Sequence, residues 1–181
     1  DIIFGDDGND IIWGQAGSDY IFGYNGNDTL IGGDGSDSLM GGAGDDIIWG
    51  ESGSNTIDGG AGNDSIIGGD GDDSILGGGG SDIIWAGAGN DTISAYSYDI
   101  NLVNTVMGGA GDDTISVAHS IVFGEDGNDN IACIDGYGST ISGGAGNETV
   151  SGSNSNDLIY GGDGNDSLQG NWGSDTIYGG G

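Results

Sequence analysis

A nine-residue repeat, Gly-Gly-x-Gly-x-Asp-x-U-x with a large aliphatic residue at U, runs through most of the chain. Residues 41–49, Gly-Gly-Ala-Gly-Asp-Asp-Ile-Ile-Trp, show the repeat in full. The 16 regular copies cover 144 of the 181 residues and begin at residues 5, 14, 23, 32, 41, 50, 59, 68, 77, 86, 108, 124, 143, 152, 161 and 170. A short, sustained period of this kind predicts a solenoid, in which each repeat packs on its neighbours.

The aliphatic eighth position is occupied by an apolar residue in all 20 of its occurrences. These residues are Ile3, Ile12, Ile21, Leu30, Leu39, Ile48, Ile57, Ile66, Ile75, Ile84, Ile93, Val106, Ile115, Val122, Ile131, Ile141, Val150, Ile159, Leu168 and Ile177. In each x-U-x triplet the middle side chain of a short strand points inward, and the glycine-rich remainder forms a turn. Two nonapeptides make one coil of about 18 residues, so strands alternate between two sheets. We therefore predict an all-β fold, a parallel, right-handed β-roll, with residues 1–181 as a single domain.

The chain has a net charge of −30, because it contains 30 Asp and Glu residues and no Lys or Arg. Nothing is available to neutralise phosphate groups, so we predict no nucleic-acid partner. No apolar run approaches the length of a membrane span, and no signal peptide is visible. High charge with low complexity is also typical of disorder, but the regular apolar positions favour a folded chain. Its thin core is expected to need cations as well as apolar burial, since the carboxylates repel one another.

The turns are the candidate cation sites. Stacked turns bring carboxylates and carbonyl oxygens together at each edge of the roll, and many hard oxygen ligands on a flexible loop suit Ca²⁺ better than Mg²⁺ or a transition metal. In this motif the chain resembles the RTX (repeats-in-toxin) family of secreted bacterial proteins, and the resemblance covers nearly the whole sequence. It implies that each ion lies between neighbouring turns, held by turn carbonyls and sixth-position aspartates.

By this resemblance the predicted calcium ligands are Asp10, Asp19, Asp28, Asp37, Asp46, Asp64, Asp73, Asp82, Asp91, Asp113, Asp129, Asp157, Asp166 and Asp175. Asn55 and Glu148 occupy the same position and are expected to make weaker sites, because Asn lacks the charge and Glu is longer. Counting the gaps between stacked regular turns predicts about 13 Ca²⁺ ions, or about +26, against the charge of −30. Loss of calcium should unfold the chain.

Three turns depart from the regular length, at residues 95–104, 117–120 and 133–139. Because turns alternate between edges, all three are predicted to lie on one edge, and the other edge carries nine regular turns. The irregular turns contain Tyr96, Tyr98, His119, Cys133 and Tyr137, including the only His and Cys of the chain. They are either a recognition site on a rigid scaffold or tolerated imperfections of the repeat. We expect no Cys–His catalysis and no enzyme activity.

Outward-pointing residues at the seventh and ninth positions are mostly polar on one sheet and apolar on every second strand of the other. The apolar set is Ile11, Trp13, Ile47, Trp49, Ile83, Trp85, Ile121, Phe123, Leu158 and Tyr160. The aromatic residue recurs every two coils, about 9.6 Å at normal strand spacing. A strip of this size predicts packing against another copy or a partner domain. The alternatives are a cross-strand ladder that only stiffens the sheet and a carbohydrate-binding strip.

These features favour a secreted, calcium-binding structural protein that assembles through the apolar face, or end to end, into a fibre, matrix or surface layer. The alternative is the calcium-folded module of a larger secreted enzyme, toxin or adhesin. The RTX resemblance implies an extracellular location, at the cell surface or in a matrix. The chain starts and stops within a repeat, which suggests a segment of a longer array or a self-stacking unit.

Overall fold

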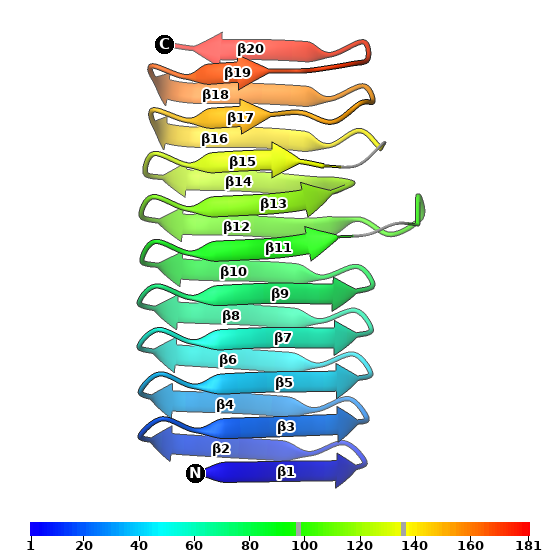
Figure 1. The fold of residues 1–181 in the computed structure, drawn as a ribbon, viewed down its shortest axis with the longest axis vertical. Coiled ribbons are helices and arrows are strands. Elements are labelled where there is room, and N and C mark those ends of the chain that lie inside the picture. Colours follow the sequence, from blue (N-terminus) through cyan, green and yellow to red (C-terminus); the bar gives the residue numbers. More distant parts are fainter. Residues whose placement is uncertain (97–98, 135–136) are drawn as a thin grey trace.

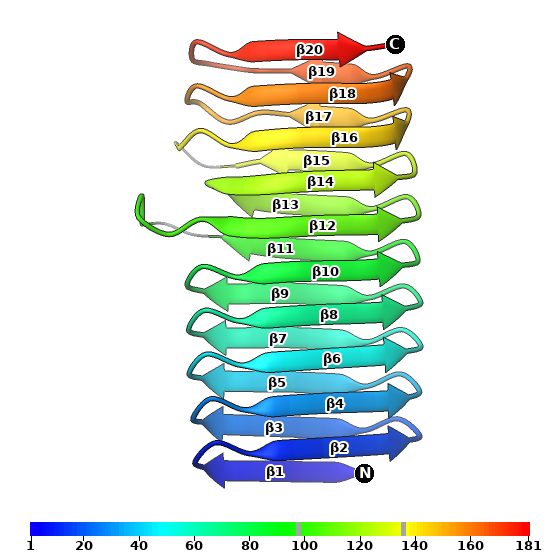
Figure 2. The ribbon, with the colours of Figure 1, turned by 180° about the vertical axis from the view of Figure 1, so that it is seen from behind.

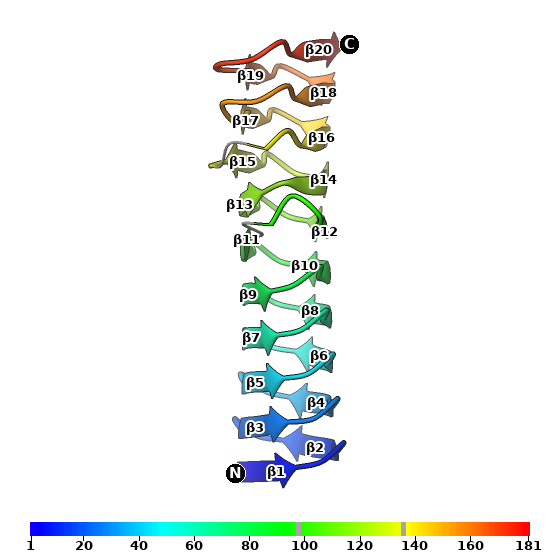
Figure 3. The same cartoon turned by 90° about the vertical axis from the view of Figure 1, so that its right-hand side faces the viewer.

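In a computed structural model, the chain forms two parallel ten-stranded sheets that lie face to face in a straight stack (Figures 1 and 3). The structure describes residues 1–96, 99–134 and 137–181. The strands are β1 (Ile2–Asp7), β2 (Ile11–Ala16), β3 (Tyr20–Asn25), β4 (Thr29–Asp34), β5 (Ser38–Ala43), β6 (Ile47–Ser52), β7 (Thr56–Ala61), β8 (Ser65–Asp70), β9 (Ser74–Gly79), β10 (Ile83–Ala88), β11 (Thr92–Tyr96), β12 (Asn104–Ala110), β13 (Thr114–Ala118), β14 (Ser120–Asp126), β15 (Asn130–Cys133), β16 (Thr140–Gly146), β17 (Thr149–Ser151), β18 (Leu158–Gly164), β19 (Ser167–Gln169) and β20 (Thr176–Gly180).

Sheet A contains the odd-numbered strands and sheet B the even-numbered strands, each in chain order. Every strand therefore pairs with the strand two places along the chain, one coil later. The β-roll prediction is confirmed: the coil length is 18 residues in the regular part, as in the pairing of Ile48 with Ile66 and the hydrogen bond between Asp46 and Asp64. No residue that the structure describes is helical.

The register of the core survives the irregular turns. In sheet B, Ile84 pairs with Val106, Val106 with Val122 and Val122 with Ile141. These coils differ in length: equivalent turn positions in successive coils are 22, 16 and 19 residues apart. The turns absorb the inserted and deleted residues, because a one-residue slip would turn each inward side chain to the outer face.

The core is the predicted ladder of eighth-position residues. From Ile12 to Ile159 these side chains are at most 8% exposed, while Ile3 and Leu168, near the two ends of the stack, are partly buried. Ile177 in β20 is 43% exposed. Each inward side chain packs against the opposite sheet and against the coils before and after it, which gives a thin, continuous apolar column.

The two edges of the stack differ. Turns from sheet B to sheet A form the regular edge, with nine turns of the repeat length, on the left in Figure 1. Turns from sheet A to sheet B form the interrupted edge, where the β11–β12, β13–β14 and β15–β16 connections are irregular (Figure 2). Residues 97–98 and 135–136 of these connections lie outside the described residues.

The fourth position is glycine in all regular turns except the one from Gly152, and most of these glycines are needed for both their conformation and their close contacts. Gly80 has a φ of 142°, and a Cβ there would collide with the carbonyl oxygen of Gly62 one coil below. The preceding residue, Gly79, has neither constraint: a Cβ there would meet no atom within 4 Å.

We predict opposite outcomes for the two neighbouring substitutions. Gly80→Ala should destabilise the calcium-loaded protein by more than about 1–2 kcal/mol, because it adds left-handed strain to a backbone clash. Gly79→Ala should change the free energy of unfolding by less than about 0.5 kcal/mol, or stabilise slightly by restricting the unfolded chain. Urea unfolding followed by circular dichroism measures both, and equal losses of stability would show that the fourth position is not special.

Candidate calcium sites in the stacked turns

The sixth-position aspartates are buried at the edges of the roll. Eleven of the 14 are at most 3% exposed, namely Asp19, Asp28, Asp37, Asp46, Asp64, Asp73, Asp82, Asp91, Asp113, Asp129 and Asp157. Asp10, Asp166 and Asp175 are half-buried. Ionised carboxylates are very costly to bury without partners, so the contacts of each oxygen decide what these turns can do.

One oxygen of these carboxylates supports the backbone. Oδ1 of Asp64 accepts a hydrogen bond from the backbone N–H of Asp46 at 2.8 Å, and Oδ1 of Asp91 accepts one from Asp73 at 2.8 Å. The same bond recurs from coil to coil on both edges, so each aspartate holds the equivalent residue of the preceding coil. The ladder fixes the vertical spacing of the turns.

The second oxygen is left without a partner. Oδ2 is buried and accepts no hydrogen bond in Asp10, Asp19, Asp28, Asp37, Asp46, Asp64, Asp73, Asp82, Asp91, Asp113 and Asp129. Such atoms are rare in folded proteins and point to a missing ligand.

Ten of these eleven oxygens lie beside the first-position glycine of their own turn, and the exception is Asp91, whose turn begins with Ala86. A Cβ on Gly14 would lie 2.7 Å from Oδ2 of Asp19 and 2.6 Å from the carbonyl oxygen of Gly32 in the next coil. The absent side chain therefore leaves room beside a carboxylate oxygen and a carbonyl oxygen. Among the described residues, no three Asp, Glu, His or Cys side chains form a metal-binding group. Carboxylates supplemented by turn carbonyls are a donor set that fits Ca²⁺.

Burial disfavours the ionised form of these carboxyls. It raises the pKa of Asp64, Asp73 and Asp113 to about 7, and repulsion from the carboxylates of neighbouring coils adds to the effect. Burial also raises the pKa of Asp37, Asp46, Asp82, Asp91 and Asp129. Without a cation, these turns therefore hold their carboxyls in an environment that opposes their charge.

Two sixth-position residues on the regular edge, Asn55 and Glu148, are not aspartates, and their contacts differ. Asn55 keeps the ladder, because its Oδ1 accepts the N–H of Asp37 at 2.9 Å, but its Nδ2 donates to Gly53 O at 3.0 Å. A nitrogen thus takes the place of the free carboxylate oxygen. Both carboxylate oxygens of Glu148 are buried without a hydrogen-bond partner. Burial, and then the nearby Asp166, raise the pKa of Glu148 to about 7.

On the interrupted edge, neutral side chains continue the ladder through the irregular turns. Oδ1 of Asn104 accepts the N–H of Asp82 at 2.8 Å, and Oγ of Ser139 accepts the N–H of Ser120 at 3.1 Å. Our sequence reasoning missed these residues. The available signal was their position: Asn104, Ser120 and Ser139 each directly precede a strand triplet, where regular repeats have aspartate.

The remaining residues of the irregular turns make structural contacts. Nδ1 of His119 lies 3.0 Å from Leu102 O, and its ring centroid lies 5.5 Å from that of Tyr137, so His119 links all three irregular turns. Cys133 is buried, and burial raises the pKa of its thiol to about 11, which opposes formation of a nucleophilic thiolate. Tyr96 is half-buried at the end of β11, and Tyr98 lies outside the described residues.

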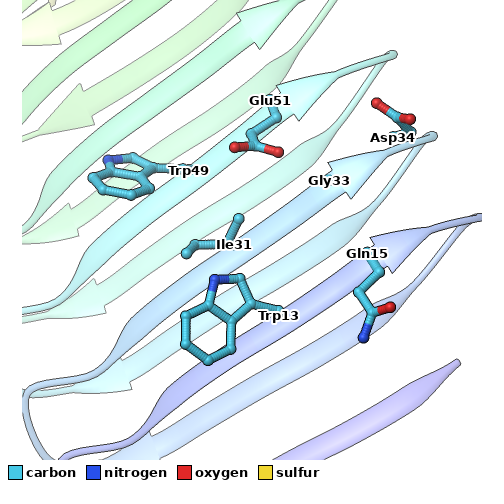
Figure 4. Close-up of a pocket in the computed structure, with 7 residues that line it drawn as sticks. All are labelled: Trp13, Gln15, Ile31, Gly33, Asp34, Trp49 and Glu51. Carbon is cyan, nitrogen blue, oxygen red and sulfur yellow. The ribbon is translucent and has the colours of Figure 1, made fainter.

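The predicted interface residues all lie on strands of sheet B, on its outer face. Nine of the ten are exposed, and Leu158 is half-buried. Trp13 and Trp49 flank Ile31 across a groove of about 660 Å³, with Gln15, Asp34 and Glu51 toward the regular edge (Figure 4).

A family model described as the RTX calcium-binding nonapeptide repeat (4 copies) matches residues 1–30, 31–66, 58–93, 101–116, 137–159 and 151–181. No curated protein matches the chain. In the part of the chain that the structure describes, no helix is long and apolar enough to cross a membrane.

We predict that the metal-free and calcium-loaded proteins depend on pH in opposite ways. A raised folded-state pKa means that the folded chain holds protons that the unfolded chain releases. In chelator, the stability that these carboxyls contribute should be complete below their unfolded pKa of about 3.9. It should be lost as the pH rises through about 7, the folded-state pKa of Asp64, Asp73 and Asp113.

With saturating calcium the direction should reverse, because the ion needs ionised carboxylates and protons compete with it. Circular dichroism between about pH 4 and pH 8, in chelator and in calcium, measures the folded fraction and so both dependences. A metal-free protein that becomes more stable as the pH rises would contradict the assignment of the buried carboxyls.

We further predict that Glu148→Asp stabilises the calcium-loaded protein. The shorter side chain matches the aspartates above and below it, so one oxygen can support the backbone of Asp129 and the other is free for the cation. Satisfying a buried polar group is worth about 1–3 kcal/mol. Glu125→Asp, at an exposed position, is the matched control and should leave the midpoint of unfolding unchanged. Equal midpoints for wild type and Glu148→Asp would show that this turn already tolerates Glu.

Proposed function

The chain belongs to the RTX calcium-binding nonapeptide repeat family, and from this we propose that it is a secreted structural protein that folds on Ca²⁺ and assembles through the outer face of sheet B. The observation that carries the proposal is the absence of charge at the seventh and ninth positions of sheet B, where exposed aromatic and aliphatic side chains recur, in a chain with 30 Asp and Glu residues. Proteins with RTX repeats are typically secreted, and such repeats bind Ca²⁺ in a structural β-roll rather than perform catalysis.

The unpartnered Oδ2 atoms support calcium sites between successive turns, held by the sixth-position aspartates and turn carbonyls. On the regular edge, nine stacked turns leave space for about eight ions, and the interrupted edge adds about five, which gives about 13 in all. Asn104, Ser120 and Ser139 replace the carboxylates where the interrupted edge is irregular, which supports a stretch without ions there. Bound calcium would offset most of the charge of −30, the main obstacle to association of two copies.

The outer face of sheet B has the composition of an interface rather than of a solvated surface. No charged residue occupies any of its 20 seventh and ninth positions from Ile11 to Tyr178, and the charged Glu51 and Glu125 stand at the second position of the turn, toward the regular edge. Ten of the large apolar side chains at the 20 positions are 38–63% exposed, and the other four are half-buried. A contiguous apolar surface of this size is unusual on a soluble monomer. By contrast, sheet A is mostly polar on its outer face from β11 onward, with Thr92 and Ser94 as an example.

We predict that the wild-type protein in calcium has a mass above 17.8 kDa by size-exclusion chromatography with light scattering, and that Trp49→Asp is a monomer. A buried, unpaired carboxylate in the interface costs several kcal/mol, which dissociates a moderately tight complex. Ser116→Asp, on the outer face of sheet A, is the control and should associate as wild type does. Circular dichroism confirms that each variant folds in calcium.

A monomeric wild type would overturn the proposal of self-assembly. It would favour the second candidate function, a calcium-folded module of a longer secreted protein whose apolar face packs against another domain of that protein.

A further inference from the structure

The seventh position of sheet B alternates strictly between large aliphatic and small hydroxyl side chains. Ile or Leu stands on β2, β6, β10, β14 and β18, and Thr or Ser stands on β4, β8, β12, β16 and β20. The aliphatic set is Ile11, Ile47, Ile83, Ile121 and Leu158, and the hydroxyl set is Thr29, Ser65, Thr105, Thr140 and Thr176. The alternation is unbroken through the three irregular turns.

The ninth position follows the same alternation. The five strands with an aliphatic seventh position carry an aromatic ring at the ninth, namely Trp13, Trp49, Trp85, Phe123 and Tyr160. The strands β4, β8, β12 and β16 between them carry Ile31, Ile67, Met107 and Ser142. Only β20 departs from it, where Tyr178 stacks on Tyr160 with ring centroids 5.0 Å apart. The aromatic residues are exposed and the four residues between them are half-buried. The face therefore consists of ridges on β2, β6, β10, β14 and β18 and grooves on β4, β8, β12, β16 and β20. Figure 4 shows one groove, with Ile31 at its floor between Trp13 and Trp49.

The second position of the turn extends the ridges. Among sheet B strands, only Gln15, Glu51 and Glu125 carry a side chain there, and all three stand on ridge strands. Their φ angles are 77°, 70° and 78°, in the left-handed region. A non-glycine residue in this region costs about 1–2 kcal/mol, and every groove strand has glycine at this position.

Ridges and grooves with this period fit a second copy of the same face. Successive ridges are two strand spacings apart, about 9.6 Å, and another sheet B presents ridges at the same interval. The face measures about 48 Å by about 20 Å from its strand number and length. That is about 950 Å², close to the area of about 800 Å² that each partner contributes to a standard specific interface.

The symmetry of the pair follows from the strand count. A two-fold axis parallel to the long axis of the roll would place each strand opposite its own equivalent, ridge against ridge. A two-fold axis along the strands, midway along the ten-stranded sheet, lies between β10 and β12. It places β2 opposite β20, β6 opposite β16 and β10 opposite β12, so every ridge strand faces a groove strand.

We propose, on the basis of the assembly proposed above, that two copies pack through sheet B as an antiparallel two-fold dimer, with the ridges of each copy in the grooves of the other. At the ninth position, Trp49 lies opposite Ser142 of the second copy, Trp85 opposite Met107 and Phe123 opposite Ile67. At the seventh position every row pairs an aliphatic with a hydroxyl side chain. Closed two-fold pairs of this kind are the commonest soluble oligomers. Acidic side chains of the two copies meet only at the rim, where salt screens them.

The experiment exchanges a ridge and a groove in one row. Ser142→Trp fills a groove, and Trp49→Ser removes the ridge that enters it. Each single variant should raise the dimer dissociation constant at least tenfold, measured by light scattering and analytical ultracentrifugation in calcium. The double variant W49S/S142W should recover at least half of that loss on a logarithmic scale, because residue 49 of each copy faces residue 142 of the other.

Two controls separate the effect of filling a groove from the effect of adding a tryptophan elsewhere on the surface. Ser116→Trp places the same residue on the outer face of sheet A and should leave the dissociation constant unchanged. Ile67→Trp fills a different groove and should weaken the dimer as Ser142→Trp does. Circular dichroism in calcium establishes that each variant is folded.

The outcomes distinguish the two proposals. A dimer that tolerates both groove-filling variants, or a double variant no tighter than the singles, would overturn the interdigitated arrangement while self-assembly stands. A wild type that remains a monomer at high concentration would overturn both. Weakening by each single variant with recovery in the double variant would establish the arrangement.

Discussion

The structure depends on the different contacts that the two carboxylate oxygens make in most of the sixth-position aspartates. Oδ1 holds the backbone of the preceding coil, as in the bond from Asp46 to Asp64, and Oδ2 is buried beside a first-position glycine without a partner. The first interaction stacks the coils, and the second leaves a buried oxygen available to a cation. An aliphatic column only one residue wide per strand buries too little surface to offset the burial of so many carboxylates. The same groups therefore shape the fold and offer oxygens to calcium, on which we propose that the fold depends.

The nine-residue period alone places these carboxylates, because each turn repeats the same local sequence. Four of the nine positions set the turn and its carboxylate, and one sets the core, so only the outward positions and the variable turn positions are free to change. The interrupted edge shows which part is indispensable. Asn104 and Ser139 give up the charge but keep the hydrogen bond that holds the preceding coil, to the N–H of Asp82 and of Ser120. The hydroxyl of Ser120 instead donates to the carbonyl oxygen of Ala118 in its own turn. Backbone support is thus kept at two of the three positions where the carboxylate is lost.

Most of the fold could be predicted from the sequence, because every element is local and repeated. The eighth-position ladder identified the core from Ile12 to Ile159, and the turn count placed the irregular turns on one edge. The sequence could not show which oxygen of each aspartate supports the backbone, since that depends on the offset between coils. It also did not reveal Ser139 as a ladder residue, because a serine in an irregular turn has no distinguishing pattern until its neighbours are placed. Burial of Cys133 was equally hidden, since it follows from the way the 133–139 turn continues the core.

The outer face of sheet B follows a period that the fold itself does not need. A single coil suffices for the core and the turns, yet the outward residues of sheet B repeat over two coils. Water would accept any polar residue at these positions, and cross-strand pairing alone would be as well served by an aromatic on every strand. Alternation of large and small side chains is useful when the large side chains of a second surface with the same spacing enter the grooves above the small ones. The two periods therefore record two constraints on one sequence: the shorter comes from the stacking of the coils, and we propose that the longer comes from contact with a second sheet.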